Sequence, residues 1–288
     1  MLQMPILRTS RSAERKSRAQ HSASPARHEV FPSHRDQSQV VESTYQQAVK
    51  VEQVDDSLPK DQLVEALRGQ HALVIAFSGS QTQNSIKLAD AAFEAGVKHI
   101  VPADYGSCDS SDPRSLELVP LYKSKKEVRD YLIGLSQRSR PDGSHLTWTS
   151  LITGHFFDYG LKSGLLAVDI KEHKARVFDG GNIRFSASTL ADIGLATAKV
   201  LGRVGDARLS NKLVNAHSVA TTQNELIGKV EGAVGPKFEV EQVSSNEYIK
   251  EQKGLLAGDG SQDSAAIEEL VSVEGIVMQI GRTKGICS

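Results

Sequence analysis

Uninterrupted apolar runs and helical apolar stripes alternate through the middle of the chain. Residues 72–77 are apolar without alternation and are followed by Ser78-Gly79-Ser80, which is typical of a strand covered on both faces. Apolar residues then recur at helical spacing between residues 86 and 93, and residues 97–101 predict a second short strand. A strand, a helix and a strand so close together indicate a crossover between parallel strands. The predicted fold class is therefore α/β, a Rossmann-like parallel sheet with helices on both faces.

The same alternation of apolar runs and helical apolar stripes continues on either side of this unit. Further elements are expected as a strand at residues 49–54, a helix at 58–67, a helix at 116–134 and a strand at 145–152. The pattern is less regular after residue 201, where short strands are expected at residues 213–215 and 238–240 and helices at 224–231 and 245–253. These later elements predict a smaller α+β domain.

Composition divides the chain into three parts. Residues 1–45 are polar and basic with few apolar positions, and they are expected to be largely disordered apart from a possible strand at residues 4–9. Residues 46–202 carry the regular strand and helix pattern of the main domain, with an insertion near residues 160–184. Residues 203–288 are expected to form the smaller domain.

Two short polar loops follow the central strands. Ligands of parallel α/β sheets lie beyond the carboxyl ends of the strands. Residues 78–81 and 103–107 occupy that position, and both combine small and polar residues that let a cofactor approach the backbone. Because serine and glycine are also common in ordinary turns, the pattern alone leaves both interpretations open.

Lys125 is the candidate catalytic residue of the helix predicted at residues 116–134. Its neighbours at minus four, plus three and plus seven are Leu121, Val128 and Leu132, which places Lys125 on or beside the inward apolar stripe. The next face carries Lys126 with Tyr122, Arg129 and Asp130 and is expected to be solvated. Loss of solvent lowers the pKa of a lysine and suits it to proton transfer near neutral pH. The alternative is a stem packed on the core with its ammonium group reaching water.

An aromatic segment follows the strand predicted at residues 145–152. It reads Gly154-His155-Phe156-Phe157. Aromatic side chains at the end of a parallel strand can line a pocket, which makes Phe156 and Phe157 candidates. Ordinary core packing of Phe156 and Phe157 is the alternative.

Taken in order, these segments resemble the isoflavone reductase-like and NmrA-like family of atypical short-chain dehydrogenases, which bind NADP(H). The resemblance is carried by the strand before Ser78, the run from Ala95 to Pro102, Asp104-Tyr105-Gly106-Ser107, the Lys125-x-x-Val128-Arg129 pattern and the run from Thr153 to Phe157. Residues 186–201 also look like the family's later segment. The resemblance covers residues 51–201 well and the remainder loosely.

The resemblance implies roles for particular residues. Lys125 takes the position of the family's catalytic lysine. The implied cofactor neighbours are Ser78, Gly79, Tyr105, Gly106 and Phe156, the last as a wall between nicotinamide and substrate. The implied chemistry is hydride transfer from NADPH to an unsaturated or carbonyl carbon, with Lys125 as acid and base.

The chain departs from the family at its start. A dinucleotide-binding sheet begins with a strand, a glycine-rich turn and a helix whose amino end holds the pyrophosphate. Residues 1–68 contain no glycine, so this first strand-loop-helix unit is expected to be missing. The run from Ile6 to Ser12 looks like the family's second strand and its basic loop, with Arg8 or Arg11 contacting the 2′-phosphate of NADP. A disordered basic start is the alternative.

Composition and charge limit the classes of partner that the chain is expected to bind. The formal net charge of −1 gives no global attraction to nucleic acid or an anionic membrane, and no apolar stretch approaches the length of a membrane span. Two cysteines cannot build a disulfide framework, and no metal-ligand spacing occurs among the cysteines and histidines. A cytoplasmic setting is expected, with a mitochondrial presequence as an alternative for the Arg- and Ser-rich start.

Three functions follow from these observations. The first is an NADPH-dependent oxidoreductase that reduces a small, aromatic or other, secondary metabolite. The second is an NAD(P)-sensing regulator without catalysis, which would act through a protein partner. The third is a truncated chain that cannot bind the cofactor, because loss of a pyrophosphate loop removes several charge-assisted hydrogen bonds.

Overall fold

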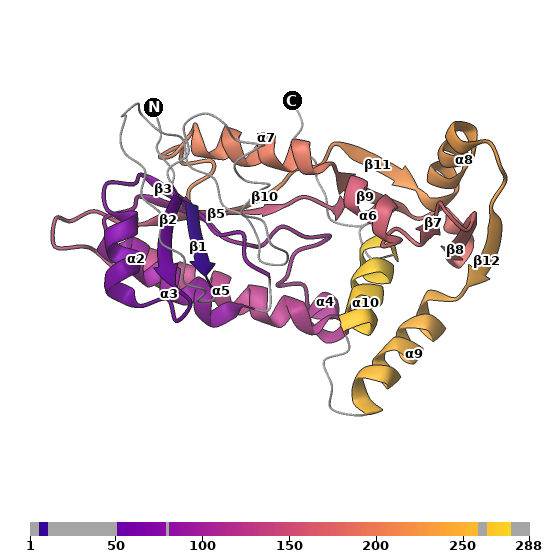
Figure 1. The fold of residues 1–288 in the computed structure, drawn as a ribbon, viewed down its shortest axis with the longest axis horizontal. Helices are drawn as coiled ribbons and strands as arrows, with labels where there is room; N and C mark the ends of the chain where they lie inside the picture. The colour runs from indigo at the N-terminus through magenta and orange to yellow at the C-terminus, as the bar shows by residue number, and fades with distance from the viewer. Residues whose placement is uncertain (1–5, 11–50, 79–80, 259–263, 278–288) are drawn as a thin grey trace, which may run out of the picture. The chain divides into compact units, whose positions relative to one another are not determined.

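The computed structural model describes residues 6–10, 51–78, 81–258 and 264–277 (Figure 1). The chain divides into two compact units. The first comprises Met1–Ala103, Glu127–Ser150 and Val200–Lys212, and the second comprises Asp104–Lys126, Leu151–Lys199 and Leu213–Ser288. The two units are therefore interleaved along the chain.

Parallel strands form the frame of the first unit. Strand β1 (Ile6–Ser10) pairs in parallel with β2 (Val51–Asp55). A second sheet has the order β10-β5-β4-β3, with β3 at Ala72–Val74, β4 at His99–Val101, β5 at Thr147–Ile152 and β10 at Lys212–Asn215. Strand β4 runs parallel to both β3 and β5. The predicted α/β class with a parallel sheet is confirmed, and a strand is present where the run after Met4 predicted one.

Helices bury their apolar stripes in the core of the first unit. They are α2 (Lys60–Leu67), α3 (Thr82–Glu94) and the later turns of α5 (Pro120–Ser136). Their inward residues Leu63, Leu88 and Leu132 are almost completely buried together with Ile100 of β4. Helix α3 ends as expected, because Gly96 has a φ of 84°, a conformation that glycine adopts without strain.

The single helix predicted at residues 116–134 is two helices in the structure. Helix α4 spans Pro113–Leu118, and α5 begins at Pro120. Val119 between them has an extended backbone, with φ −120° and ψ 107°. A residue before proline is sterically disfavoured in the helical region, which explains the break.

The second unit contains two small sheets. One has the order β11-β9-β6, formed by β6 (His155–Phe156), β9 (Arg184–Ser188) and β11 (Val219–Thr222). The other has the order β12-β8-β7, formed by β7 (Val168–Asp169), β8 (Lys174–Phe178) and β12 (Glu239–Val243). The helical segments are α6 (Phe157–Ser163), the short η1 (Asp179–Gly181), α7 (Leu190–Leu201), α8 (Gln223–Val234), α9 (Ser245–Gly258) and α10 (Ser264–Val277). The pattern did not predict strands β6, β7, β8, β9 and β11 or helices α6, α7 and α10.

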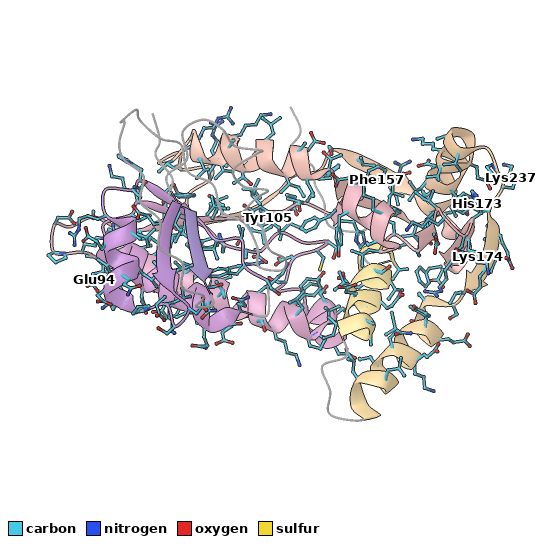
Figure 2. All side chains as sticks on the ribbon, in the orientation of Figure 1. Glu94, Tyr105, Phe157, His173, Lys174 and Lys237 are labelled. Carbon is cyan, nitrogen blue, oxygen red and sulfur yellow. The ribbon has the colours of Figure 1, made fainter. Side chains whose placement is uncertain are left out.

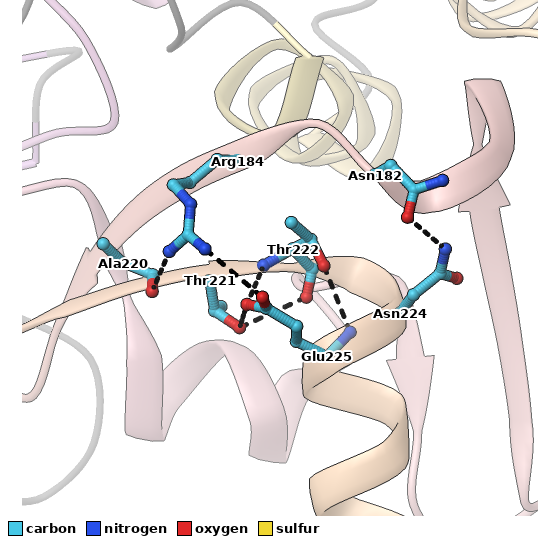
Figure 3. Close-up of polar contacts among 7 residues, drawn as sticks. All are labelled: Asn182, Arg184, Ala220, Thr221, Thr222, Asn224 and Glu225. Carbon is cyan, nitrogen blue, oxygen red and sulfur yellow. Dashed lines mark hydrogen bonds and ion pairs between the residues drawn. The ribbon is translucent and has the colours of Figure 1, made fainter.

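A capping box starts helix α8 (Figure 3). The Thr222 hydroxyl accepts the Glu225 N–H at 3.1 Å, and the Glu225 carboxylate accepts the Thr222 N–H at 3.1 Å. Arg184 of β9 adds an ion pair to Glu225 at 3.2 Å and donates to the carbonyl of Ala220 at 2.9 Å. These bonds satisfy amides at the helix start and fasten it to the neighbouring strand.

Gly154 allows the chain to turn from β5 into β6. It has a φ of 71°, and a Cβ at this position would overlap the backbone carbonyl of Ser186 in β9. Both the dihedral angle and the close approach exclude a side chain. Nearby, the Ser188 hydroxyl donates to the Thr153 carbonyl at 2.7 Å, which closes the turn.

We expect Gly154→Ala to lower the free energy of unfolding by roughly 2–4 kcal/mol, since it adds backbone strain to a steric overlap. The matched control is Gly194→Ala in α7, where an added Cβ meets nothing within 4 Å. The control should stabilise the chain by about 0.5–1 kcal/mol through helix propensity. Urea unfolding measures both changes, and equal midpoints for the two variants would contradict this account of the turn.

Candidate functional site

Lys125 lies in the second turn of α5 and is buried, with 9% of its surface exposed. Its Nζ atom donates a hydrogen bond of 2.6 Å to the backbone carbonyl of Tyr105, a residue labelled in Figure 2. The expected inward position of Lys125 is therefore observed. A buried ammonium group needs such an acceptor, because removal from water disfavours its charge.

Gly106 makes room for the lysine. A Cβ on Gly106 would lie 3.0 Å from the Lys125 Nζ atom, so even alanine would crowd the amine. The Gly106 carbonyl accepts a hydrogen bond of 3.2 Å from the N–H of Thr153. This bond ties the loop after β4 to the segment that leads into Phe156.

The Tyr105 side chain is engaged elsewhere. The Thr197 hydroxyl donates to the Ile193 carbonyl within α7, so the Tyr105 hydroxyl is the donor in its 3.1 Å contact with Thr197. Burial raises the pKa of Tyr105 to about 12, which keeps the phenol protonated at neutral pH. The main chain of Tyr105 thus orients Lys125, while its side chain anchors the loop to α7.

A buried carboxyl group from α10 meets the same loop. Glu274 is fully buried and accepts hydrogen bonds from the hydroxyls of Ser115 at 2.7 Å, Ser107 at 3.1 Å and Tyr122 at 3.3 Å. The Ser107 and Tyr122 hydroxyls also share a hydrogen bond of 2.5 Å, so one of the two donates to the other while its partner donates to Glu274. Sequence reasoning missed Glu274, since α10 was not expected and nothing in its pattern distinguishes Glu274 from Glu268 and Glu269.

Tyr122 corrects the face assignment made from the sequence. It was expected on the solvated face of its helix, but 1% of its surface is exposed because it packs with Val119 and Leu270. Burial, reinforced by the charge of Glu274, holds the pKa of Tyr122 well above its usual range. The same two causes raise the pKa of the Cys108 thiol. Both groups therefore stay protonated at neutral pH.

His155 and Phe156 form strand β6 beside this loop. His155 is buried, packs edge-on against Phe185 with 5.9 Å between ring centroids, and has no partner for Nε2 among the described residues. Burial lowers the pKa of His155 to about 4, so the ring is neutral at pH 7. Phe156 is half-buried at the end of β6.

The remaining candidates fall in three places. Ser78 is exposed just after β3, in the first unit. Arg8 lies in β1 opposite Gln53 of β2. Gly79 and Arg11 lie outside the described residues. The structure brings Tyr105, Gly106 and Lys125 together in the second unit, whereas Ser78 and Arg8 belong to the first.

The residues around Lys125 fit the reacting end of a nicotinamide cofactor better than its phosphates. The buried amine of Lys125, held by a backbone carbonyl beside Gly106, supplies one proton donor rather than the several backbone donors that phosphates require. Residues 1–68 offer no glycine-rich turn for a pyrophosphate. Within the described part of the chain, no cluster of three or more His, Cys, Asp or Glu side chains is arranged to hold a metal ion.

Comparison with known proteins identifies the family. The chain matches the model of the NmrA-like family over residues 16–277. It belongs to the NmrA-like family.

Two curated relatives are fungal oxidoreductases. Oxidoreductase aprR of Aspergillus flavus is 28% identical over 221 residues, covering 75% of this chain and 71% of that protein. Oxidoreductase poxI of Penicillium oxalicum is 26% identical over 202 residues, covering 69% of this chain and 62% of that protein.

Solved structures share the fold of this NmrA-like chain. An isoflavone reductase has a TM-score of 0.65 at 20% identity, covering 96% of this chain and 79% of that one. AtPrR2 with NADP+ and (+)pinoresinol has a TM-score of 0.63 at 22% identity, covering 83% and 74%. The resemblance predicted from the sequence is confirmed at the level of family and fold. None of the helices in the described ranges combines the length and apolar composition that crossing a bilayer takes.

We expect the stability of the chain to fall as the pH drops from about 6.5 to 4. The buried rings of His155 and His99 have a pKa lowered to about 4, mainly by burial, whereas in the unfolded chain they titrate near 6.5. The unfolded state therefore binds more protons in this window, and protonation favours unfolding. Each ring contributes on the order of 2–3 kcal/mol that is fully present above pH 6.5.

Urea unfolding at several pH values tests this expectation. His155→Gln removes one of the two contributions and should flatten the pH dependence by about half. His71→Gln is the control, because His71 is exposed. An unchanged slope in His155→Gln would show that His155 is not buried in its neutral form.

Proposed function

We propose that this chain is an NADPH-dependent reductase of a small, aromatic secondary metabolite, with Lys125 as the acid and base. The observation that carries the proposal is the buried amine of Lys125, held 2.6 Å from the Tyr105 carbonyl at the end of a parallel strand. The naming of aprR and poxI as oxidoreductases supports the reaction class. The fold shared with AtPrR2, solved with NADP+ and (+)pinoresinol, supports the cofactor and an aromatic substrate.

In the proposed reduction the cofactor supplies the hydride and the protein supplies the proton. NADPH supplies the hydride to an unsaturated or carbonyl carbon of the substrate. Lys125 supplies the matching proton, directly or through one water, and regains it from solvent. The Tyr105 carbonyl accepts a hydrogen bond from one of the three N–H groups of the ammonium, and this bond fixes the directions in which the other two N–H groups point.

Other residues are proposed as the surroundings of the cofactor. Phe156 forms a wall between nicotinamide and substrate, and the Tyr105 and Gly106 backbone lies beside it. Ser78 and Gly79 approach the cofactor from the loop after β3. Arg8 or Arg11 contacts the 2′-phosphate, because a guanidinium group binds phosphate oxygens in pairs.

The first test is a calorimetric titration of the purified chain with NADPH. The proposal expects a dissociation constant in the micromolar range, although residues 1–68 lack a glycine-rich turn, with weaker binding of NADH. Binding without turnover of any quinone, ketone or enone would favour a sensing regulator. No binding at millimolar NADPH would refute the proposal.

The second test replaces the lysine. Lys125→Met keeps the buried stem and removes the amine, so kcat should fall roughly 10²–10⁴-fold, the usual loss when a general acid is removed. NADPH affinity should change little, because the amine is proposed to act on the substrate. Lys123→Met, on the exposed side of the same helix, should leave both quantities unchanged. Full turnover by Lys125→Met would exclude the catalytic role.

A further inference from the structure

Glu274 is the most deeply buried acid near the candidate site. It lies in α10, the last described helix, and none of its surface is exposed. Its carboxyl oxygens accept hydrogen bonds from three hydroxyls, those of Ser107, Ser115 and Tyr122. A buried carboxyl group is costly unless it is hydrogen-bonded, so these donors offset its desolvation.

Two of the three donors flank the Lys125 hydrogen bond. Ser107 lies two residues after Tyr105, whose carbonyl accepts a hydrogen bond from the Lys125 Nζ atom. Tyr122 lies one turn before Lys125 on α5, and its ring centroid is 5.8 Å from the same Nζ atom. Glu274 therefore holds both the loop that carries the acceptor and the helical turn that carries the donor.

The backbone of α10 approaches this loop as closely as its side chain does. A Cβ on Gly275 would overlap the His155 imidazole and lie 2.7 Å from the Ser107 Cβ atom. Leu270, one turn before Glu274, packs with Val119 and Tyr122 in a small buried cluster. The helix is thus fixed against the loop by contacts on both sides of Glu274.

We propose that Glu274 is a positioning residue for Lys125, acting through Ser107 and Tyr122. It fixes the distance from the Lys125 Nζ atom to the Tyr105 carbonyl and keeps the amine shielded. Glu274 does not touch the substrate in this arrangement. Its catalytic importance rests on the function proposed above, but its effect on Lys125 does not.

Ser115 provides a matched control within the same network. It donates to the other carboxyl oxygen of Glu274 at 2.7 Å, and it lies in α4, ten residues after Tyr105 and outside the helix that carries Lys125. If Glu274 only stabilised the fold, Ser115→Ala and Ser107→Ala would have similar consequences. If Glu274 positions Lys125, only Ser107→Ala should affect the amine.

Competitive labelling of amines with acetic anhydride, read by peptide mass spectrometry, measures the reactivity of Lys125 without cofactor or substrate. Lys123 on the exposed side of the helix is the internal reference. Glu274→Gln and Ser107→Ala should raise Lys125 labelling relative to Lys123 by about fivefold or more, as expected when a hydrogen bond is lost. Ser115→Ala should leave the ratio unchanged while lowering the melting temperature.

Two labelling results would overturn the proposal. An unchanged labelling ratio in folded Glu274→Gln overturns it, and so does an equal rise in Ser115→Ala and Ser107→Ala. Should Glu274→Gln fail to fold, Ser107→Ala against Ser115→Ala gives the same decision. In a preparation that turns over, Glu274→Gln should lower kcat and shift its pH profile with the NADPH dissociation constant unchanged. Absence of NADPH turnover would refute the proposed function, while the labelling result would still decide the role of Glu274.

Discussion

The hydrogen bond from the Lys125 ammonium group to the Tyr105 carbonyl sets the requirements for the rest of the candidate site. An amine with 9% exposure cannot rely on water and needs an acceptor in a fixed position. That acceptor belongs to a loop, and loops hold position only when other contacts secure them. Three contacts do so: the Gly106 carbonyl binds the Thr153 N–H, the Tyr105 phenol binds Thr197, and Ser107 binds Glu274.

Glu274, the second buried ionisable group of the site, holds this loop although it lies far from the loop in the sequence. Glu274 is separated from Ser107 by 167 positions, yet its carboxyl group lies 3.1 Å from the serine hydroxyl. Burial of Tyr122 raises its pKa, so its hydroxyl remains a donor at neutral pH. A polar network of this kind is favourable only when its members are satisfied, which ties α10 to one position against the loop.

Membership of the NmrA-like family accounts for the fold of the chain, whereas its chemistry has to be argued from the residues of the candidate site. Relatives of 26–28% identity are oxidoreductases, and structures of 20–22% identity share the fold. The same frame hosts different substrates through its loops and its less regular second unit. In this chain the second unit supplies Tyr105, Gly106, Lys125, Phe156 and Glu274. Packing within that unit therefore sets the geometry of the candidate site.

The sequence by itself determined the parallel strands, the helices between them, the family and the inward position of Lys125. The strands, the helices and the position of Lys125 follow from local periodicity, since a buried strand is apolar throughout and a packed helix repeats its apolar face. The family follows from the resemblance that the ordered motifs carry. The break of the predicted helix at Val119 is also local, since a residue before proline disfavours the helical region, and the pattern reading overlooked it. Only the tertiary structure decided that Tyr122 is buried and that Glu274 meets Ser107. Tyr122 was misplaced because one helical face can be covered by a distant element, and an acid in an apolar helix carries no local sign of its partners. Contacts between residues far apart in sequence form when packing brings them together, and no short pattern records them.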